Sequence, residues 1–160
     1  MQSQNIIGGN LVLSKAGLTG LSGAATTYTI GAAITYALYG KLLSKGTVAG
    51  GASPTTDGVT NNAITVKPGY GTNVVWVLDA SGNVKCVQGS NELLDAAGNF
   101  QFAAPQFPNL PDTLLPFAYS IIKNLASGTL FTFGVSNWNQ TGITVTANDI
   151  MAIPNRPQVS

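Results

Sequence analysis

The sequence of 160 residues contains no histidine, which removes the commonest general base of enzymes and the usual nitrogen ligand of metal ions. A single cysteine, Cys86, excludes an internal disulfide and any zinc site built from several cysteines. It lies in an apolar strand pattern, so we expect a buried and unreactive thiol. These residues therefore give us no candidate for a catalytic, cofactor-binding or metal-binding position.

The six carboxylates show no sign of a paired acid and base. A glycoside hydrolase needs two convergent carboxylates, whereas most of the acids here occupy turn sequences. Neither a Gly-x-Ser-x-Gly elbow nor a phosphate-binding Gly-Lys loop occurs. We expect a protein that is not an enzyme, and a carboxylate site without a familiar motif is the catalytic alternative that stays open.

Charge is also scarce, since 8% of the residues are charged, against roughly 25% in an ordinary soluble domain. The net charge is +1 and no run of Lys or Arg forms the basic stripe that a nucleic-acid partner requires. Either partner subunits cover much of the surface, or Thr, Ser and Asn keep a neutral monomer soluble.

Two segments are apolar enough to raise the question of a secretory signal or a membrane-spanning helix. The start of the chain lacks the basic region of a secretory signal. Residues 16–40 are uncharged and long enough to span a bilayer, but Thr, Ser and Gly interrupt the apolar positions. We expect a soluble chain with no membrane partner.

What the sequence does contain is apolar residues alternating with polar ones at the period of a β-strand. In the stretch 25–45 the apolar positions face Thr27, Thr29 and Thr35, with a break at Gly31. These apolar positions are Tyr28, Ile30, Ile34, Tyr36 and Leu38. No heptad or amphipathic helical stripe occurs, so the chain is predicted to be all-β, a β-sandwich or small barrel of jelly-roll-like type.

The clearest hairpin joins residues 74–78 to residues 84–87 through the turn Asp79–Asn83. An Asp at the start and a Gly near the end predict a type I turn closed by a left-handed glycine. The same pattern returns at Asp95–Asn99. Calcium needs about six to eight oxygens, so turn chemistry is the preferred interpretation of both aspartates.

Residues 105–123 contain four prolines and should exclude a helix or a central strand. We interpret this stretch as an extended crossover from one sheet to another, followed by Phe117, Tyr119 and Ile121 on one face. Residues 46–62 have the composition of a polar loop.

The chain is divided into an N-terminal arm, residues 1–24, and a single all-β domain, residues 25–160. The arm places apolar residues among glycines, so it should become ordered by packing on its own sheet or on a neighbouring subunit. These candidate interface residues are Ile6, Ile7, Leu11, Leu13, Leu18 and Leu21. If residues 1–21 are a clamp or a swapped arm, their removal should leave a folded, all-β product that no longer associates with other chains.

Two tryptophans are candidates for different roles. Trp138 lies between asparagines in a loop, where it could stack on a sugar, anchor an interface or fold back to cap the end of the sandwich. Trp76, inside the hairpin, is expected in the core.

The C-terminal part of the sequence resembles a family of small virion proteins of tailed phages and prophages. The resemblance covers roughly residues 60–157 and consists of turn and proline motifs, with no catalytic residue among them. The motifs are Phe107–Asp112, Pro116–Tyr119, Phe131–Gly134, Trp138 with Thr141–Thr144, Asp149–Ile150 and Ile153–Pro157.

That resemblance implies a capsid decoration or cement protein, which binds the outside of the head, most naturally as a homotrimer. The implied partner is the phage major capsid protein, and the implied location is the virion surface after a soluble stage in the host cytoplasm. Arg156, in the terminal motif, joins the candidate interface residues. The alternative is a receptor- or glycan-binding module of a tail fibre with Trp138 as its stacking platform.

Overall fold

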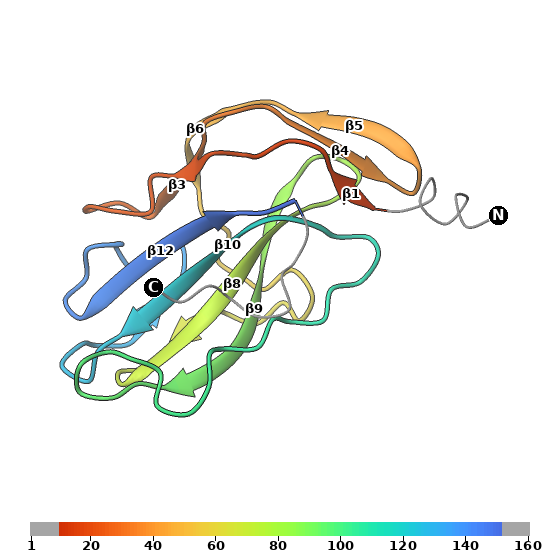
Figure 1. Ribbon diagram of the computed structural model, residues 1–160. Coiled ribbons are helices and arrows are strands. Elements are labelled where there is room, and N and C mark those ends of the chain that lie inside the picture. Colours follow the sequence, from red (N-terminus) through yellow and green to blue (C-terminus); the bar gives the residue numbers. More distant parts are fainter. Residues whose placement is uncertain (1–9, 152–160) are drawn as a thin grey trace.

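The computed structural model describes residues 10–151 and shows an all-β fold of sheets packed face to face (Figure 1). Within that range the chain forms strands, turns and irregular segments but no helix, which confirms the predicted all-β sandwich. In these residues no helix is long and apolar enough to cross a membrane.

The strands vary from two to ten residues in length. In chain order they are β1 (Leu11–Val12), β2 (Leu18–Thr19), β3 (Thr27–Ile30), β4 (Ile34–Leu38), β5 (Lys41–Lys45), β6 (Val48–Ala52), β7 (Thr65–Val66), β8 (Tyr70–Leu78), β9 (Val84–Leu93), β10 (Leu115–Asn124), β11 (Phe131–Thr132) and β12 (Ile143–Asp149).

One layer is built from two three-stranded sheets, β1-β4-β5 and β2-β3-β6. The pairing in one sheet continues in the other: β4 pairs with β5, and the strands on either side of them in sequence, β3 and β6, pair with each other. The two sheets are therefore the halves of one bent layer, which is visible as the red and orange strands in Figure 1. The bend occurs around Gly31, where the sequence predicts a break, and the residues predicted to face the core do so.

The second layer is the four-stranded antiparallel sheet β12-β10-β8-β9. Its β8–β9 hairpin, with β9 at the edge, is the one predicted around residues 79–83. The proline-rich segment leaves β9 at one edge and returns as β10 inside the same sheet, so the predicted crossover between sheets is wrong. Instead Phe107 and Leu110 pack over the outer face of this sheet. We call residues 105–111 the strap.

The predicted exclusion of a central strand from residues 105–123 is also wrong. β10 contains Pro116 and lies between β8 and β12. Pairing with β12 begins only at Ala118, so at Pro116 the strand has a partner on one side, which accommodates a residue without an N–H group.

A β-bulge overturns the prediction that Phe117, Tyr119 and Ile121 share a face. The register with β8 shifts between Pro116 and Ala118, so one extra residue is inserted there. Phe117 consequently packs in the core between the layers, whereas Tyr119 and Ile121 lie beneath the strap. A shift by one residue reverses the side of every later side chain.

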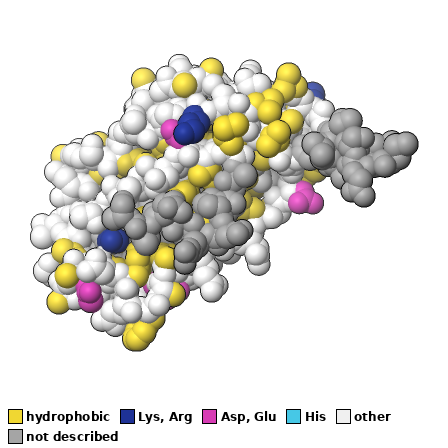
Figure 2. All heavy atoms as spheres, in the orientation of Figure 1, with side chains coloured by type: hydrophobic (Ala, Val, Ile, Leu, Met, Phe, Trp, Pro, Cys, Tyr) yellow, Lys and Arg dark blue, Asp and Glu magenta, His cyan; other side chains and the backbone are white. Residues whose placement is uncertain are grey.

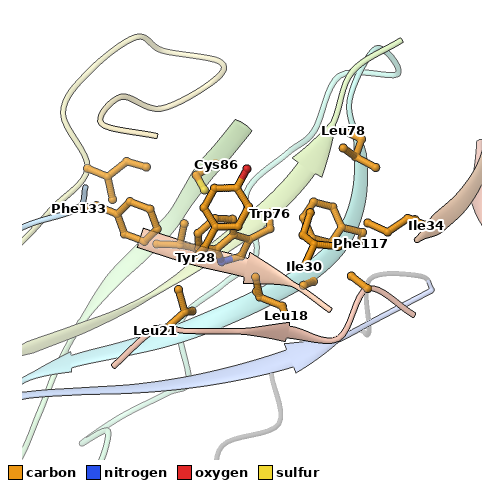
Figure 3. Packing of buried hydrophobic residues seen from close by; sticks show 14 of the residues in the cluster. Leu18, Leu21, Tyr28, Ile30, Ile34, Trp76, Leu78, Cys86, Phe117 and Phe133 are labelled. Carbon is orange, nitrogen blue, oxygen red and sulfur yellow. The ribbon is translucent and has the colours of Figure 1, made fainter. Parts of the chain in front are cut away.

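The main core lies between the two layers and is rich in aromatic residues (Figure 3). Tyr28 and Phe133 pack on Trp76 with ring centroids 5.1 and 5.4 Å away. Trp76 is fully buried, as predicted, and so is Cys86. Burial, together with the nearby Asp57 carboxylate, raises the pKa of the Cys86 thiol well above its ordinary value.

The two predicted aspartate turns are confirmed. The Asp79 carboxylate accepts hydrogen bonds from the N–H groups of Ser81 and Asn83, and Gly82 adopts φ 75°. Asp95 repeats the arrangement with Ala97 and Asn99. The predicted loop 46–62 is wrong in part, because residues 48–52 form β6 despite their glycines.

Asp57 is buried, and its carboxylate accepts hydrogen bonds from the N–H groups of Val59, Thr60 and Gln88 at 2.8–2.9 Å. Burial alone would raise the pKa of this carboxyl, but the N–H donors outweigh burial and hold the pKa below its ordinary value. The carboxylate thus ties the loop before β7 to β9.

We expect acid to weaken the fold through Asp57. Its stabilising contribution is complete above the unfolded pKa of about 3.9 and is lost as the pH falls through the lower folded pKa. Asp57→Asn should cost about 2 kcal/mol at pH 7, because hydrogen bonds to a charged group are weakened, and less at pH 2.5. Urea unfolding at both pH values measures the difference in the free energy of unfolding between the variant and the original protein. Asp79 and Asp95 are present in both proteins, so their titration does not contribute to that difference. An equal cost at both pH values would contradict the prediction.

Candidate interaction surface

The outer face of the β1-β4-β5 sheet carries apolar side chains that the core does not use. Leu11 is opposite Ala37, which is opposite Leu42, so the three form one row across the sheet. Leu11 and Leu42 are 44% and 66% exposed. Leu13, which directly follows β1 and is two residues beyond Leu11, is 45% exposed. Figure 2 shows apolar side chains gathered over this part of the molecule.

Tyr39 lies at the tip of the β4–β5 hairpin and is 60% exposed. Tyr39 and Gly40 have φ values of 53° and 71°, as a two-residue type I′ turn requires. Asn or Gly is preferred at the first of these positions, and a bulky aromatic residue there is strained. Tyr39 is therefore kept at a conformational cost with its ring largely in solvent. We call Leu11, Leu13, Ala37, Tyr39 and Leu42 the hairpin surface.

Asn10 holds the hairpin tip against the neighbouring loop. Its side-chain oxygen accepts a hydrogen bond from the Tyr39 N–H at 3.0 Å, and its Nδ2 donates to the Asp112 carbonyl at 2.7 Å. The position of the aromatic ring is thus set by a fixed backbone, which lowers the entropic cost of using it in a contact.

The hairpin surface carries no charge of its own, since strands β1, β4 and β5 contain no carboxylate. Lys41 and Lys45, at the ends of β5, pair with the core-facing residues Leu38 and Ile34 and so belong to the opposite face of the sheet. β5 is also an edge strand, paired only with β4 among the described residues. An uncharged apolar surface beside an open strand edge suits a partner with apolar side chains and an unpaired strand.

The candidate interface residues from the sequence fall into three groups. Leu11 and Leu13 belong to the hairpin surface, whereas Leu18 and Leu21 are buried in the chain's own core. Ile6, Ile7 and Arg156 lie outside the described residues.

The described part of the proposed arm, residues 10–24, does not stand apart from the domain. It supplies β1 and β2, and it places Val12 and Ala16 in the main core beside Leu18. The Asp149 carboxylate at the end of β12 accepts hydrogen bonds from the N–H groups of Gly17 and Leu18, both at 3.0 Å.

Trp138 is 3% exposed and belongs to the core, not to a stacking platform. Its ring packs on Phe131 and Phe133, and its Nε1 donates to the Thr27 carbonyl at 2.8 Å. Of the roles considered from the sequence, the structure shows the one in which the loop folds back onto the sandwich.

Sequence reasoning missed Tyr39 and Leu42, which are the most exposed members of the hairpin surface. Leu42 lies between Lys41 and Leu43, where no alternation of apolar and polar residues shows which face of the strand it is on. The signal that could have identified the turn is Tyr39-Gly40 between two apolar stretches, since a glycine at the second position is typical of a type I′ hairpin.

Among residues 10–151, no group of three or more Cys, Asp or Glu side chains is placed to hold a metal ion. Comparison with protein-family models, with curated proteins and with solved structures finds no match to this chain.

Proposed function

We propose that this chain is a structural protein of a tailed-phage virion, a capsid decoration or cement protein that stabilises contacts between capsid subunits. The partner in this proposal is the major capsid protein, and the bound form is a homotrimer on the outside of the head. The role is one of binding and not of catalysis. The proposal starts from the resemblance of residues 60–157 to small virion proteins and gains support from the hairpin surface.

The observation that carries the proposal is Tyr39, an exposed aromatic side chain held in a left-handed conformation beside exposed Leu42. Within residues 10–151 no hydrogen bond or ring contact engages the Tyr39 side chain. Interface residues that contribute most to binding are often Tyr. Backbone strain of this kind occurs mainly where a site needs it.

A cement protein acts by mass action, since it binds the assembled shell more tightly than loose subunits and so favours the shell. The hairpin surface would be covered by an apolar part of the capsid protein. The open edge of β5 could also accept a strand of the partner.

The alternative role as a glycan-binding module of a tail fibre rests on Trp138. Because that side chain is buried within the described fold, it offers no surface on which a sugar could stack. We therefore do not propose a glycan-binding module with Trp138 as its stacking platform.

Co-sedimentation of the purified protein with purified phage heads tests the proposal. Binding that saturates, and heads that withstand higher temperature when covered, would support it. A protein that remains in the supernatant at every concentration tested, with heads that melt unchanged, would overturn the decoration role.

Tyr39→Asn is expected to separate stability from binding. Asn tolerates the left-handed conformation better than Tyr, so unfolding should require at least as much denaturant as for the original protein. Loss of a central aromatic contact costs about 2 kcal/mol or more, which is roughly 30-fold in affinity for heads. Val135→Asn changes an apolar residue that is 64% exposed away from the hairpin surface and should leave affinity unchanged. Equal affinity for heads in both variants would exclude Tyr39 from the interface.

A further inference from the structure

A polar cavity lies at the start of β8, apart from the hairpin surface. It has a volume of about 190 Å³ and is lined by Thr65, Lys67, Tyr70 and Asn91. These residues come from β7, from the turn that follows it, and from β8 and β9. Sites that enclose drug-sized ligands measure roughly 300–1,000 Å³, so this cavity is suited to one small ring.

A rigid turn places two of the lining residues side by side. The Tyr70 N–H donates to the Lys67 carbonyl at 3.2 Å, which closes the turn Lys67-Pro68-Gly69-Tyr70. Gly69 has φ 80°, so proline and glycine occupy the positions that a type II turn prefers. The Gly69 N–H also donates to the Asn124 carbonyl, and the Gly69 carbonyl accepts from the Leu94 N–H, both at 2.8 Å. The turn is therefore fixed to the end of β10 and to the residue that follows β9.

Gln88 orients the third lining residue. Its Nε2 donates to the Thr65 carbonyl at 2.9 Å and to Asn91 Oδ1 at 3.3 Å. With its oxygen engaged in this way, Asn91 keeps both Nδ2 hydrogens available for another acceptor. Since Gln88 links the β7 side of the cavity to the β9 side, it sets the spacing between them.

The cavity is rich in hydrogen-bond donors that have no partner within the described residues. The single ion pair in residues 10–151 joins Lys85 to Asp79, so the Lys67 ammonium is unpaired there. The hydroxyls of Thr65 and Tyr70 likewise form no hydrogen bond within that range, and none of its carboxylates lines the cavity. The Tyr70 ring adds an apolar surface beside these polar groups.

We propose that this cavity binds a carboxylated sugar, such as a hexuronic acid residue. The Lys67 ammonium would pair with the carboxylate, Asn91 Nδ2 and the two hydroxyls would bind sugar hydroxyl groups, and the Tyr70 ring would contact C–H groups of the sugar. A small inorganic oxyanion could accept hydrogen bonds from the same donors but would leave the Tyr70 ring without a contact. The inference concerns the isolated chain and does not rest on the capsid role.

The test is a titration of the ¹⁵N-labelled full-length protein with sodium glucuronate, followed by amide chemical shifts. The amides of Gly69 and Asn91 should shift and saturate. Glucose, which lacks the carboxylate, should bind about 10-fold more weakly, and Lys67→Gln should reduce glucuronate binding to the level of glucose. Lys123→Gln, which removes a charge that lies over Phe100 and does not line the cavity, is the matched control and should bind normally.

Three results would overturn the proposal. The first is the absence of saturable shifts at Gly69 and Asn91. The second is glucuronate binding that is the same in Lys67→Gln as in the original protein. The third is binding of acetate or phosphate as tight as that of glucuronate, which would indicate a general anion site. Binding of glucuronate without any binding to phage heads would support the cavity while counting against the decoration role.

Discussion

Deletion of residues 1–21 is expected to unfold the protein instead of leaving a folded domain without its arm. The deletion removes the buried side chains of Val12, Leu18 and Leu21 together with strands β1 and β2. At about 1.5–3 kcal/mol for each of these three side chains, the loss is about 5–9 kcal/mol. A domain of this size is typically stable by about 5–15 kcal/mol, so the loss is of the same order as the whole free energy of unfolding. The Asp149 carboxylate would also lose both of its N–H donors.

Thermal melts followed by circular dichroism measure this effect. A shorter deletion of residues 2–9 removes none of the buried side chains named above and serves as the control. It should melt cooperatively near the temperature of the full-length protein. If the longer deletion melts as cooperatively and at the same temperature, β1 and β2 are not needed for folding. That result would support the prediction from the sequence that residues 1–21 form a separate arm. The shorter deletion has a second use, because retained binding to heads would exclude Ile6 and Ile7 from the interface.

The strand pattern was predictable where side chains alternate without interruption. Tyr28, Ile30, Tyr36 and Leu38 face the core as expected, because two-residue periodicity is imposed by the pleat of a strand. The turns at Asp79 and Asp95 were predictable because a short carboxylate caps N–H groups within its own turn, which is a local effect.

Predictions failed where the outcome depended on partners distant in sequence. Phe117 faces the main core because a bulge against β8 inserts one residue, and composition alone does not reveal a bulge. The glycine-rich residues 48–52 become β6 because β3 pairs with them. The strap connects two strands of the same sheet because β10 pairs with β8. The prolines do not determine which strand β10 pairs with.

Only part of each candidate site could be predicted from the sequence. The turn formed by Pro68 and Gly69 is recognisable, but Asn91 joins it only through the pairing of β8 with β9. The hairpin surface needs the register that aligns Leu11 with Leu42 through Ala37. Both sites depend on cross-strand pairs, and such pairs are a property of the folded sheet.

The strap is fastened to the sheet at Gly89, in the bulged part of β9. Asn73 Nδ2 donates to the Pro105 carbonyl at 3.1 Å, and the Gln106 N–H donates to Ser90 Oγ at 2.8 Å. The backbone of Ser90 completes the attachment, since its N–H donates to the Gln106 carbonyl at 3.1 Å. A Cβ atom at position 89 would collide with Asn73 Oδ1 and with the Gln106 carbonyl. This position therefore needs glycine for space, and not for an unusual φ value.

Gly89→Ala is consequently expected to loosen the strap and uncover the second cluster beneath it, which includes Val75, Tyr119 and Ile121. Forcing a methyl group into a packed site costs about 1–3 kcal/mol, and the lost strap hydrogen bonds add about 1 kcal/mol each. The sum is about 3 kcal/mol or more, which lowers the melting temperature by roughly 6–12 °C in a domain of this size. Calorimetry measures the shift, and hydrogen exchange should show faster exchange at the amides of Ser90 and Gln106.

Gly46→Ala is the matched control, because a Cβ atom at that position meets no other atom within 4 Å. Its melting temperature should change by no more than about 2 °C, as for a surface substitution that touches nothing. The Asn73 side chain provides a further test, since Asn73→Ala removes one of the two groups that collide with the new methyl. The costs of Gly89→Ala and Asn73→Ala should then be less than additive in the double variant. Additive costs, or a Gly89→Ala protein as stable as the original, would show that the strap does not depend on the space at Gly89.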